Sequence, residues 1–532
     1  MKTNTSSPRS FPSINTITRR DFLSRTLKGS AALGLAALTQ VPPFARRALA
    51  EGNIGLNGKK LLFIFLRGAN DALNSCIPVK DSGFTQTIRP NIWIPQEAAS
   101  YYDTTGGCDF PTAGATQFDY TKAIRVGNGF NGLHPALRFL APIYNAGDLA
   151  LIHRVGYPRQ SRSHFDSQAY WETGAPNSVS REGIFYRTLL ESGLYPANPL
   201  AGISIQGGLP TSFQGKELAI TNISDPTRYD LLGTPTPAAD TKLFNSILAG
   251  NKGVFPDKRS RALLQLNYDN LVSTLNLFST ISFDETGNTF TDSTPGATNG
   301  YYLFPTTAAK NGLGTAATNV VAQNSFSFFT QLKGAALVLN KTDAVIAGTE
   351  MGGFDTHNNQ GAVTGDHADL MKSVAWSLHG LRQYFSSHAD KTTWNNLVVV
   401  VMTEFGRTTV QNSNNGTDHA EAGLMFLAGG GVKGYGKAGR TSGIFAGTPS
   451  DSVPWATGPA GSMFGVSGRY LQRAVDYRSV LGEVIREHLG ATPNQLNKII
   501  PGYVTEPELG AHPTAVNSSV DLTPIMGELD VV

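Results

Sequence analysis

Five apolar runs alternate with polar, glycine-containing loops along the chain. Several of these runs lack a strict alternation of apolar and polar residues, which is typical of strands buried on both faces of a sheet. The runs are KLLFIFLRGAND at 60–71, DLALIHRVG at 148–156, DAVIAGTEMGGFDTH at 343–357, LVVVVMTEFGR at 397–407 and LMFLAGGGV at 424–432. They predict the strands of a central sheet.

Helical patterns lie between the predicted strands. Apolar residues recur at the spacing of one helix face in the segments 134–147, 258–278, 327–340, 365–388 and 475–490. Helices that alternate with buried strands favour an α/β fold with a mostly parallel central sheet and helices on both faces. The segment 284–325 is rich in Thr, Gly and Asn and has no periodicity, so we expect a loop-rich insertion there.

The first fifty residues have the features of an export signal. TRRDFLS at 18–24 closely matches the twin-arginine signal, an apolar segment of about eleven residues follows, and ALA at 48–50 is a small-residue cleavage site. The apolar segment is too short to span a bilayer, which needs about 20 residues. We therefore expect a signal peptide at 1–50 and a single domain at 51–532. The mature chain would span no membrane and would reach the periplasm or the medium folded, through the twin-arginine translocase.

Removing the predicted signal changes the charge of the chain. The whole sequence has 43 Lys and Arg against 40 Asp and Glu, a formal charge of +3. Residues 1–50 contain eight of the basic residues and one acid, which leaves 35 basic and 39 acidic residues and a charge of −4. The mature chain therefore has no excess of basic residues to favour binding to nucleic acid or to an acidic membrane surface.

Cysteine is scarce, with Cys76 and Cys108 as the two in the chain. In an oxidising compartment they could form a disulfide, and two buried free thiols are almost equally compatible with the sequence. Two cysteines cannot make a thiolate-rich zinc site. Twin-arginine export carries folded proteins, and a common reason is a metal or cofactor inserted beforehand, so the signal indicates a bound metal.

Polar residues follow the predicted strands. Asp71 follows the first strand, Asp355 and His357 follow the third, and Glu404 follows the fourth. Asp418 and His419 precede the fifth. Ligands of open parallel sheets bind beyond the carboxyl ends of the strands, and carboxylates and imidazoles suit zinc, manganese and other divalent ions. A single Asp after a strand is more often a helix cap, but several such loops together predict a metal site.

The motifs and their order resemble those of a known group of proteins. These motifs are LRGANDALN from residue 66, SRSHF at 161–165, GGFDTH, TEFGR and the Asp-His pair before LAGGG. The chain is similar to the alkaline phosphatase-like superfamily, which includes sulfatases and cofactor-independent phosphoglycerate mutases. More closely, it resembles the twin-arginine-exported bacterial family known as domain of unknown function 1501. The resemblance covers nearly all of residues 60–490 and implies an alkaline phosphatase-like fold.

The resemblance also implies roles for individual residues. The superfamily's first metal site would use Asp355, His357 and His419, and its second would use Asp71 and Glu404. Phe405 stands where the superfamily usually has a histidine, so the second site would favour a harder ion such as magnesium, or none. The position of the nucleophile falls on His164 or, with a one-residue shift, on Ser163. Arg162 and Arg407 lie close to predicted strand ends and are candidates for binding the anion of a substrate.

These expectations lead to two hypotheses about function. The first is an exported hydrolase that depends on one or two divalent ions (zinc, manganese or magnesium). Its substrate would be a phosphate or sulfate ester of a small molecule or a glycan. In this hydrolase Ser163 would be the nucleophile, and His164 a general acid, a further ligand or a residue that orients a ligand. The alternative is an inactive protein of the same fold that binds a glycan, an anion or a partner protein at the cell envelope.

Overall fold

A computed structural model describes most of the chain. The described residues are 54–109, 121–195, 198–225, 301–306, 320–449, 470–471, 473–503 and 524–532, with isolated positions between 246 and 292 and at 515–516. The predicted signal at 1–50, most of the predicted helix at 258–278 and most of the predicted insertion at 284–325 lie outside them.

The strands form one large, mostly parallel sheet with the order β13-β5-β12-β11-β1-β10-β6-β7, and β14 also pairs with β5. Neighbours are parallel except at β12, which runs antiparallel to both β11 and β5. The strands are β1 (Lys60–Leu66), β5 (Leu149–Gly156), β6 (Gly202–Ile205), β7 (Thr221–Ile223), β10 (Ile346–Met351), β11 (Leu397–Thr403), β12 (Gly423–Ala428), β13 (Ile444–Phe445) and β14 (Val475–Asp476). The five predicted strands are confirmed. Strands β6, β7 and β13 were not predicted.

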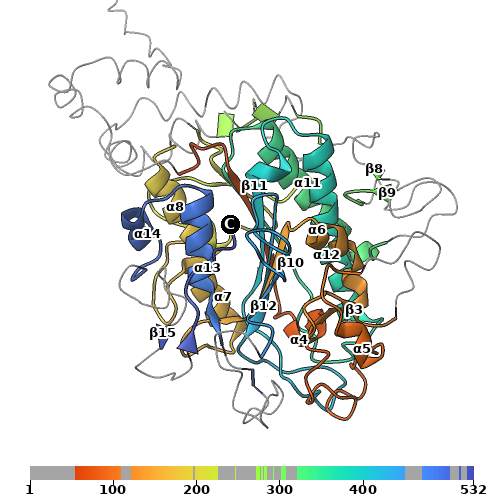
Figure 1. The fold of residues 1–532 in the computed structure, drawn as a ribbon. Helices are drawn as coiled ribbons and strands as arrows, with labels where there is room; N and C mark the ends of the chain where they lie inside the picture. Colours follow the sequence, from red (N-terminus) through yellow and green to blue (C-terminus); the bar gives the residue numbers. More distant parts are fainter. Residues whose placement is uncertain are drawn as a thin grey trace, which may run out of the picture.

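Helices cover both faces of the sheet (Figure 1), so the expected three-layer α/β arrangement is confirmed. One face carries α6 (Ala141–Asn145), α11 (Phe326–Lys341) and α12 (Asp366–Ser387), and the other carries α7 (His164–Thr173), α8 (Ile184–Ser192), α13 (Tyr477–Glu483) and α14 (Pro493–Ile499). Each face has its own hydrophobic core. Alternate residues of β1 enter the two cores, with Leu62, Ile64 and Leu66 in one and Leu61, Phe63 and Phe65 in the other. This explains why the run has no polar positions.

Two of the predicted helices differ in detail from the structure. The segment 134–147 is a 3-10 helix, Pro135–Leu140, that continues into α6. The segment 475–490 begins as β14, continues as α13 and ends in a π-helix, Val484–His488. Predicted helices at 327–340 and 365–388 correspond to α11 and α12. Helices α8 and α14 were not predicted from the sequence. None of the helices in the described part of the chain is long and apolar enough to cross a membrane.

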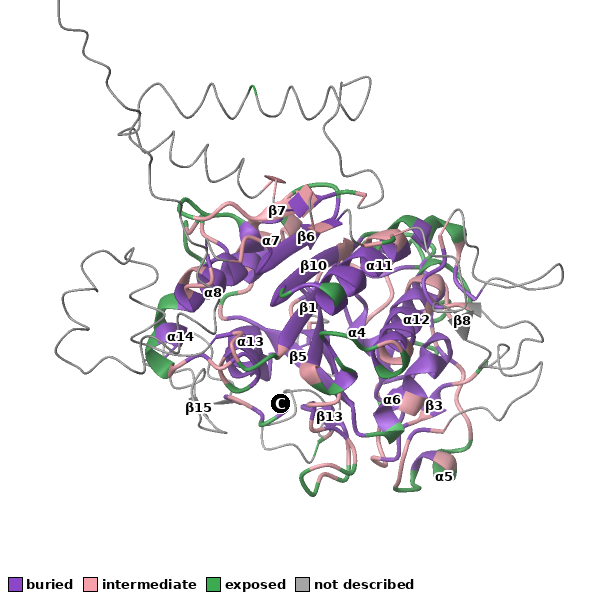
Figure 2. Ribbon diagram, turned by 90° about the horizontal axis from the view of Figure 1, so that it is seen from above, coloured by how far each residue is buried: buried purple, intermediate pink, exposed green. Residues whose placement is uncertain are grey.

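Short elements lie outside the large sheet. They are α4 (Ala72–Ser75), β2 (Cys76–Ile77), α5 (Ala99–Tyr102), β3 (Ile124–Arg125), β4 (Gly132–Leu133), β8 (Thr291–Asp292), β9 (Tyr301–Tyr302), β15 (Ala515–Val516) and β16 (Pro524–Ile525). Figure 2 shows α5 and β3 on the same side of the large sheet as α6 and α12. Strands β2, β4 and β3 form a small antiparallel sheet that carries Cys76. Both Cys76 and Cys108 are buried free thiols in this structure.

The direction of β12 brings the candidate residues to one edge of the sheet. Strands β1, β5, β10 and β11 all end at this edge. Because β12 is antiparallel to β11, it begins where β11 ends, and the connection 404–422 stays at the same edge. The residue after β11 and the residues before β12 can therefore meet the loops that follow β5 and β10.

Candidate metal centre

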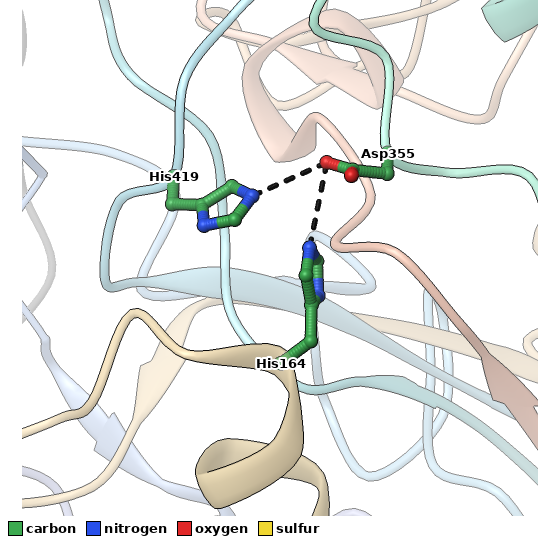
Figure 3. Close-up of side chains that lie close together, drawn as sticks. All are labelled: His164, Asp355 and His419. Carbon is green, nitrogen blue, oxygen red and sulfur yellow. Dashed lines mark hydrogen bonds and ion pairs between the residues drawn. The ribbon is translucent and has the colours of Figure 1, made fainter.

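Three imidazoles converge on one carboxylate oxygen at the carboxyl edge of the sheet. The Nε2 atoms of His164, His357 and His419 lie 3.4, 3.1 and 3.2 Å from Asp355 Oδ1. His357 Nε2 and His419 Nε2 are 2.9 Å apart. Figure 3 shows His164 and His419 pointing toward Asp355 from different parts of the chain. His164, Asp355 and His419 form a group whose ligand atoms lie within 4.8 Å of one another.

Local structure places each of these side chains. His164 is the first residue of α7, and Ser163 caps the helix by accepting a hydrogen bond from the Asp166 amide at 3.4 Å. Asp355 and His357 lie in the loop that follows β10. His419 lies before β12, where its backbone pairs with that of Arg407.

The outer nitrogen of each histidine has a hydrogen-bond acceptor. His164 Nδ1 is 2.7 Å from Glu404 Oε1, His357 Nδ1 is 3.3 Å from Asp418 Oδ1, and His419 Nδ1 is 2.8 Å from the Arg162 carbonyl. Carboxylates and carbonyls accept hydrogen bonds, so these contacts assign the imidazole proton to Nδ1. A ring that carries its proton on Nδ1 alone directs the lone pair of Nε2 toward Asp355, which is the arrangement of metal-binding histidines.

The inner atoms lack the protons that would satisfy one another. His164 Nε2 is inaccessible to solvent and has no hydrogen-bond partner among the described residues. Three nitrogen lone pairs and an ionised oxygen repel each other unless a cation or added protons lie between them. Tetrahedral zinc ligands with bonds of about 2.0–2.1 Å are roughly 3.3 Å apart. The separations of 2.9–3.4 Å are close to this value, and His164, Asp355 and His419 form the group that fits one shared ion.

Glu404 lies behind His164 and is completely buried. Its Oε1 accepts hydrogen bonds from the Gly68 amide at 2.8 Å, from Gln168 Nε2 at 2.9 Å and from His164. Burial favours the neutral form of Glu404, but these donors hold its pKa below the usual value. The same contact with Glu404 raises the pKa of His164. Glu404 therefore orients His164, whereas the sequence-based prediction made it a direct metal ligand.

Asp71 is held in a different network, which the four converging residues do not share. Its carboxylate pairs with Arg89 Nη1 at 2.7 Å and accepts a hydrogen bond from Gln360 Nε2 at 2.7 Å. It also caps α4 through the Leu73 amide at 3.2 Å. The structure thus does not bring Asp71 and Glu404 together as the predicted second site, and Asp71 has the helix-capping role that is common for an Asp after a strand.

Arg407 is buried and joins the loops around the cluster. Its guanidinium donates to the carbonyls of Gly68, Ala69, Phe354 and Thr417 and to Asp355 Oδ1. Partial burial of Asp355 disfavours its charge, but Arg407 and the nearby histidines bring its pKa to about 2. The guanidinium faces protein atoms, although the sequence suggested that it binds substrate. Its position is that of a residue that fixes an ionised Asp355.

Arg162 and Ser163 lie at the rim of the cluster. The Arg162 guanidinium contacts Glu421 Oε1 at 3.0 Å and lies 3.6 Å above the centre of the Tyr470 ring. Its side chain is 40% exposed, so a ligand can reach it. Phe165 beside it is 88% exposed. Of the two residues predicted to bind an anion, Arg162 and Arg407, Arg162 is therefore the one whose position suits that role.

Two residues that support the cluster, Asp418 and Gln168, were not predicted from the sequence in these roles. Asp418 was recognised as part of an Asp-His pair but not as the acceptor for His357. Gln168, which binds Glu404, carried no signal in the sequence because its role depends on one helical turn of α7 beyond His164. The ring of Phe405 stacks on the His164 ring, with centroids 4.9 Å apart and planes inclined by 30°. At position 405, where the resemblance implied a histidine, the apolar ring of Phe405 thus packs against the His164 imidazole.

The fold and the cluster together define an α/β protein with a candidate mononuclear metal site at the carboxyl edge of its sheet. Residues 307–452 match the family described as Protein of unknown function (DUF1501). The matched segment contains Asp355, His357, Glu404, Arg407 and His419, while Asp71, Arg162, Ser163 and His164 lie outside it. No curated protein and no solved structure matches the chain.

Proposed function

We propose that this protein is an exported hydrolase that uses one divalent metal ion to cleave a phosphate or sulfate ester. The observation that supports the proposal is the convergence of the His164, His357 and His419 Nε2 atoms on Asp355 Oδ1, with each Nδ1 held by an acceptor. Three imidazoles favour zinc over magnesium, which prefers oxygen ligands. Because the oxygens of Asp71 and Glu404 have other partners, one ion is proposed instead of two.

A zinc ion held by His164, Asp355 and His419 would keep a fourth position for a water molecule, whose pKa it would lower, and it would polarise the ester. The side chains of Asp355, His357 and His419 are 46%, 34% and 25% exposed, so an ester can approach from solvent. Arg162 at the rim would bind the anionic group of the ester. Water adds its oxygen to phosphorus or sulfur, the bond to the alcohol oxygen breaks, and a proton from the water passes to the alcohol. Ser163 is engaged as a helix cap, so water is proposed as the nucleophile in its place.

Metal content tests the site directly. The purified chain, without its signal, is expected to contain about one equivalent of zinc or to take it up from solution. His419→Ala and His164→Ala should each lower the affinity by at least about tenfold, because each removes a ligand. His388→Ala is the matched control, since His388 lies at the end of α12 outside the cluster. Less than about half an equivalent, with no uptake of added zinc or manganese, would contradict the proposal.

Hydrolysis of aryl phosphates and aryl sulfates tests the reaction. The metal-loaded protein should release the aryl alcohol, treatment with a chelator should abolish the activity, and zinc should restore it. Ser163→Ala should remain active if water is the nucleophile, and an inactive but metal-loaded Ser163→Ala protein would assign the attack to Ser163. Full metal binding with no hydrolysis of either ester class would favour the alternative of a binding protein.

A further inference from the structure

A cavity of about 430 Å³ lies beside the loop that carries Asp355. Its wall is built from the beginning of α11, the end of β10 and the beginning of α12. The volume falls within the range of roughly 300–1,000 Å³ that is typical of small-molecule sites. Gly353, which lines the cavity, is two residues before Asp355, so their Cα atoms are at most about 7 Å apart. A small ligand in the cavity could therefore extend to the metal centre.

An ion-pair network connects the wall of the cavity with α7, the helix that begins with His164. Glu350 lines the cavity and pairs with Arg67 Nε at 2.9 Å. Arg67 Nη1 also contacts Glu172 Oε1 at 2.5 Å. Glu172 belongs to α7, the helix whose first residue is His164. Because Arg67 follows β1, the two ion pairs tie the ends of β1 and β10 to the last turn of α7.

The lining of the cavity offers unused hydrogen-bonding groups. The side chains of Ser327, Gln331 and Asp366 line it and make no hydrogen bond or ion pair with another residue in the described part of the chain. Phe328 and Leu370 add apolar surface to the same wall. Hydroxyl, amide and carboxylate groups next to an aromatic ring suit a molecule with many hydroxyl groups and one apolar face, because each hydroxyl both donates and accepts hydrogen bonds.

The same wall disfavours an anion. None of the described lining residues is Lys or Arg, whereas Glu350, Asp366 and Asp369 are acidic. Asp366 and Asp369 lie in the first turn of α12, where their charges offset the positive end of the helix. The acidic groups are also partly neutralised, because Glu350 pairs with Arg67 and Asp369 pairs with Lys372 at 3.3 Å. A neutral polyhydroxyl group therefore fits better than either a phosphate or a strongly cationic ligand.

We infer that this cavity binds a monosaccharide unit, and that the ester cleaved at the metal centre is borne by a sugar. The second clause rests on the proposed function, and the first does not. Ser327, Gln331 and Asp366 would bind the sugar hydroxyls, and the partly buried Leu370 would pack on the apolar face of the ring. The ester group would extend past Gly353 toward Asp355 and Arg162.

Binding is tested on the whole chelator-treated protein, so that failure of the hydrolase proposal does not affect the result. Methyl β-D-glucoside and methyl β-D-galactoside serve as probes in saturation-transfer NMR, with ethylenediamine as a cationic probe. At least one of the two glycosides should bind in the millimolar range. Gln331→Ala and Asp366→Asn should each weaken binding by about tenfold, the effect of losing one hydrogen bond that involves a charged or buried group.

Asp343→Asn is the matched control, since Asp343 is exposed near the start of β10, at the opposite edge of the sheet. It should leave binding unchanged. Binding of ethylenediamine alone, binding of neither class, or equal binding by the cavity variants and the control would overturn the assignment of the cavity. In the metal-loaded protein, Gln331→Ala should raise KM for a sugar ester by a larger factor than KM for an aryl ester, whereas Asp343→Asn should change neither. If binding is confirmed but sugar esters are not cleaved, the sugar site stands and the hydrolase proposal fails.

Discussion

At the scale of single residues, the outer nitrogen of each imidazole decides what the inner nitrogen can bind. Glu404 is the clearest case, because its carboxylate is 2.7 Å from His164 Nδ1 and is itself fixed by three further donors (the Gly68 amide, Gln168 and Thr403). Such outer contacts hold the ring in the orientation and tautomer that a metal requires. A change at Glu404 should therefore affect the metal without removing a ligand.

We predict that Glu404→Gln lowers the affinity for zinc by about tenfold to a hundredfold, the usual effect of losing an outer carboxylate. A neutral amide can still accept from His164, but it no longer favours a polarised imidazole. Competition with a chromogenic chelator measures the affinity. Glu421→Gln is the control at the exposed rim, and an unchanged affinity of Glu404→Gln would show that the contact is not needed for metal binding.

Asp71, in contrast to Glu404, is expected to affect the stability of the fold and not the metal. Its ion pair with Arg89 has both side chains fully buried. Asp71→Asn leaves the Arg89 charge without its partner, so we predict a loss of about 3–5 kcal/mol in the free energy of unfolding with the metal content unchanged. Urea unfolding and metal analysis of the same sample measure both quantities. Loss of metal at unchanged stability would restore Asp71 as a ligand.

At the scale of elements, the sequence predicted that polar residues at the ends of different strands would lie close together. The physical basis of this prediction applies to the structure. Runs such as 397–407 have to be buried strands, and parallel strands end at one edge of a sheet. It could not predict which of these residues face each other. Whether Glu404 binds a metal or a histidine depends on the position of α7, and whether Asp71 is free depends on Arg89, eighteen residues further on, reaching back to it.

The C-terminal segment is another element whose role depends on tertiary contacts. The backbone amides of Leu529, Asp530, Val531 and Val532 all donate to the carboxylate of Glu483 in α13. One oxygen pair thus satisfies four consecutive amides. Burial raises the pKa of Glu483, although these donors favour its charged form.

We predict that Glu483→Gln lowers the free energy of unfolding by about 2–3 kcal/mol, because an amide offers one acceptor oxygen and places a donor against backbone amides. The C-terminus should also become accessible to carboxypeptidase. Glu217→Gln, at an exposed position, is the control. Equal stability and equal protease resistance would show that the segment is held by its apolar residues alone.

At the scale of the whole molecule, buried histidines make the fold sensitive to acid. Burial lowers the pKa of His134 to about 3 and those of His153, His367 and His488 to about 4. In the unfolded chain these groups titrate near 6.5. The unfolded state therefore binds more protons below pH 6.5, and the stability present at neutral pH falls as the pH decreases toward 4.

Each of the four groups is expected to contribute a slope of up to about 1.4 kcal/mol per pH unit within that window. Urea unfolding of the chelator-treated protein between pH 7 and 4.5 measures the combined slope. His488→Asn should reduce it by about one proton, because a neutral side chain does not titrate. A stability that stays constant across this range would contradict the assigned protonation states.

The chain positions of the converging side chains have a consequence for how the molecule is held together. His164 and Asp355 are 191 positions apart, and His419 lies a further 64 along the chain. An ion bound to all of them would act as a cross-link that closes two long chain loops, as a disulfide does in many small proteins. Cys76 and Cys108 do not supply one here, since both are buried thiols, and burial raises the pKa of Cys76 to about 12. Metal loading would thus be expected to stabilise the fold by restricting the unfolded chain.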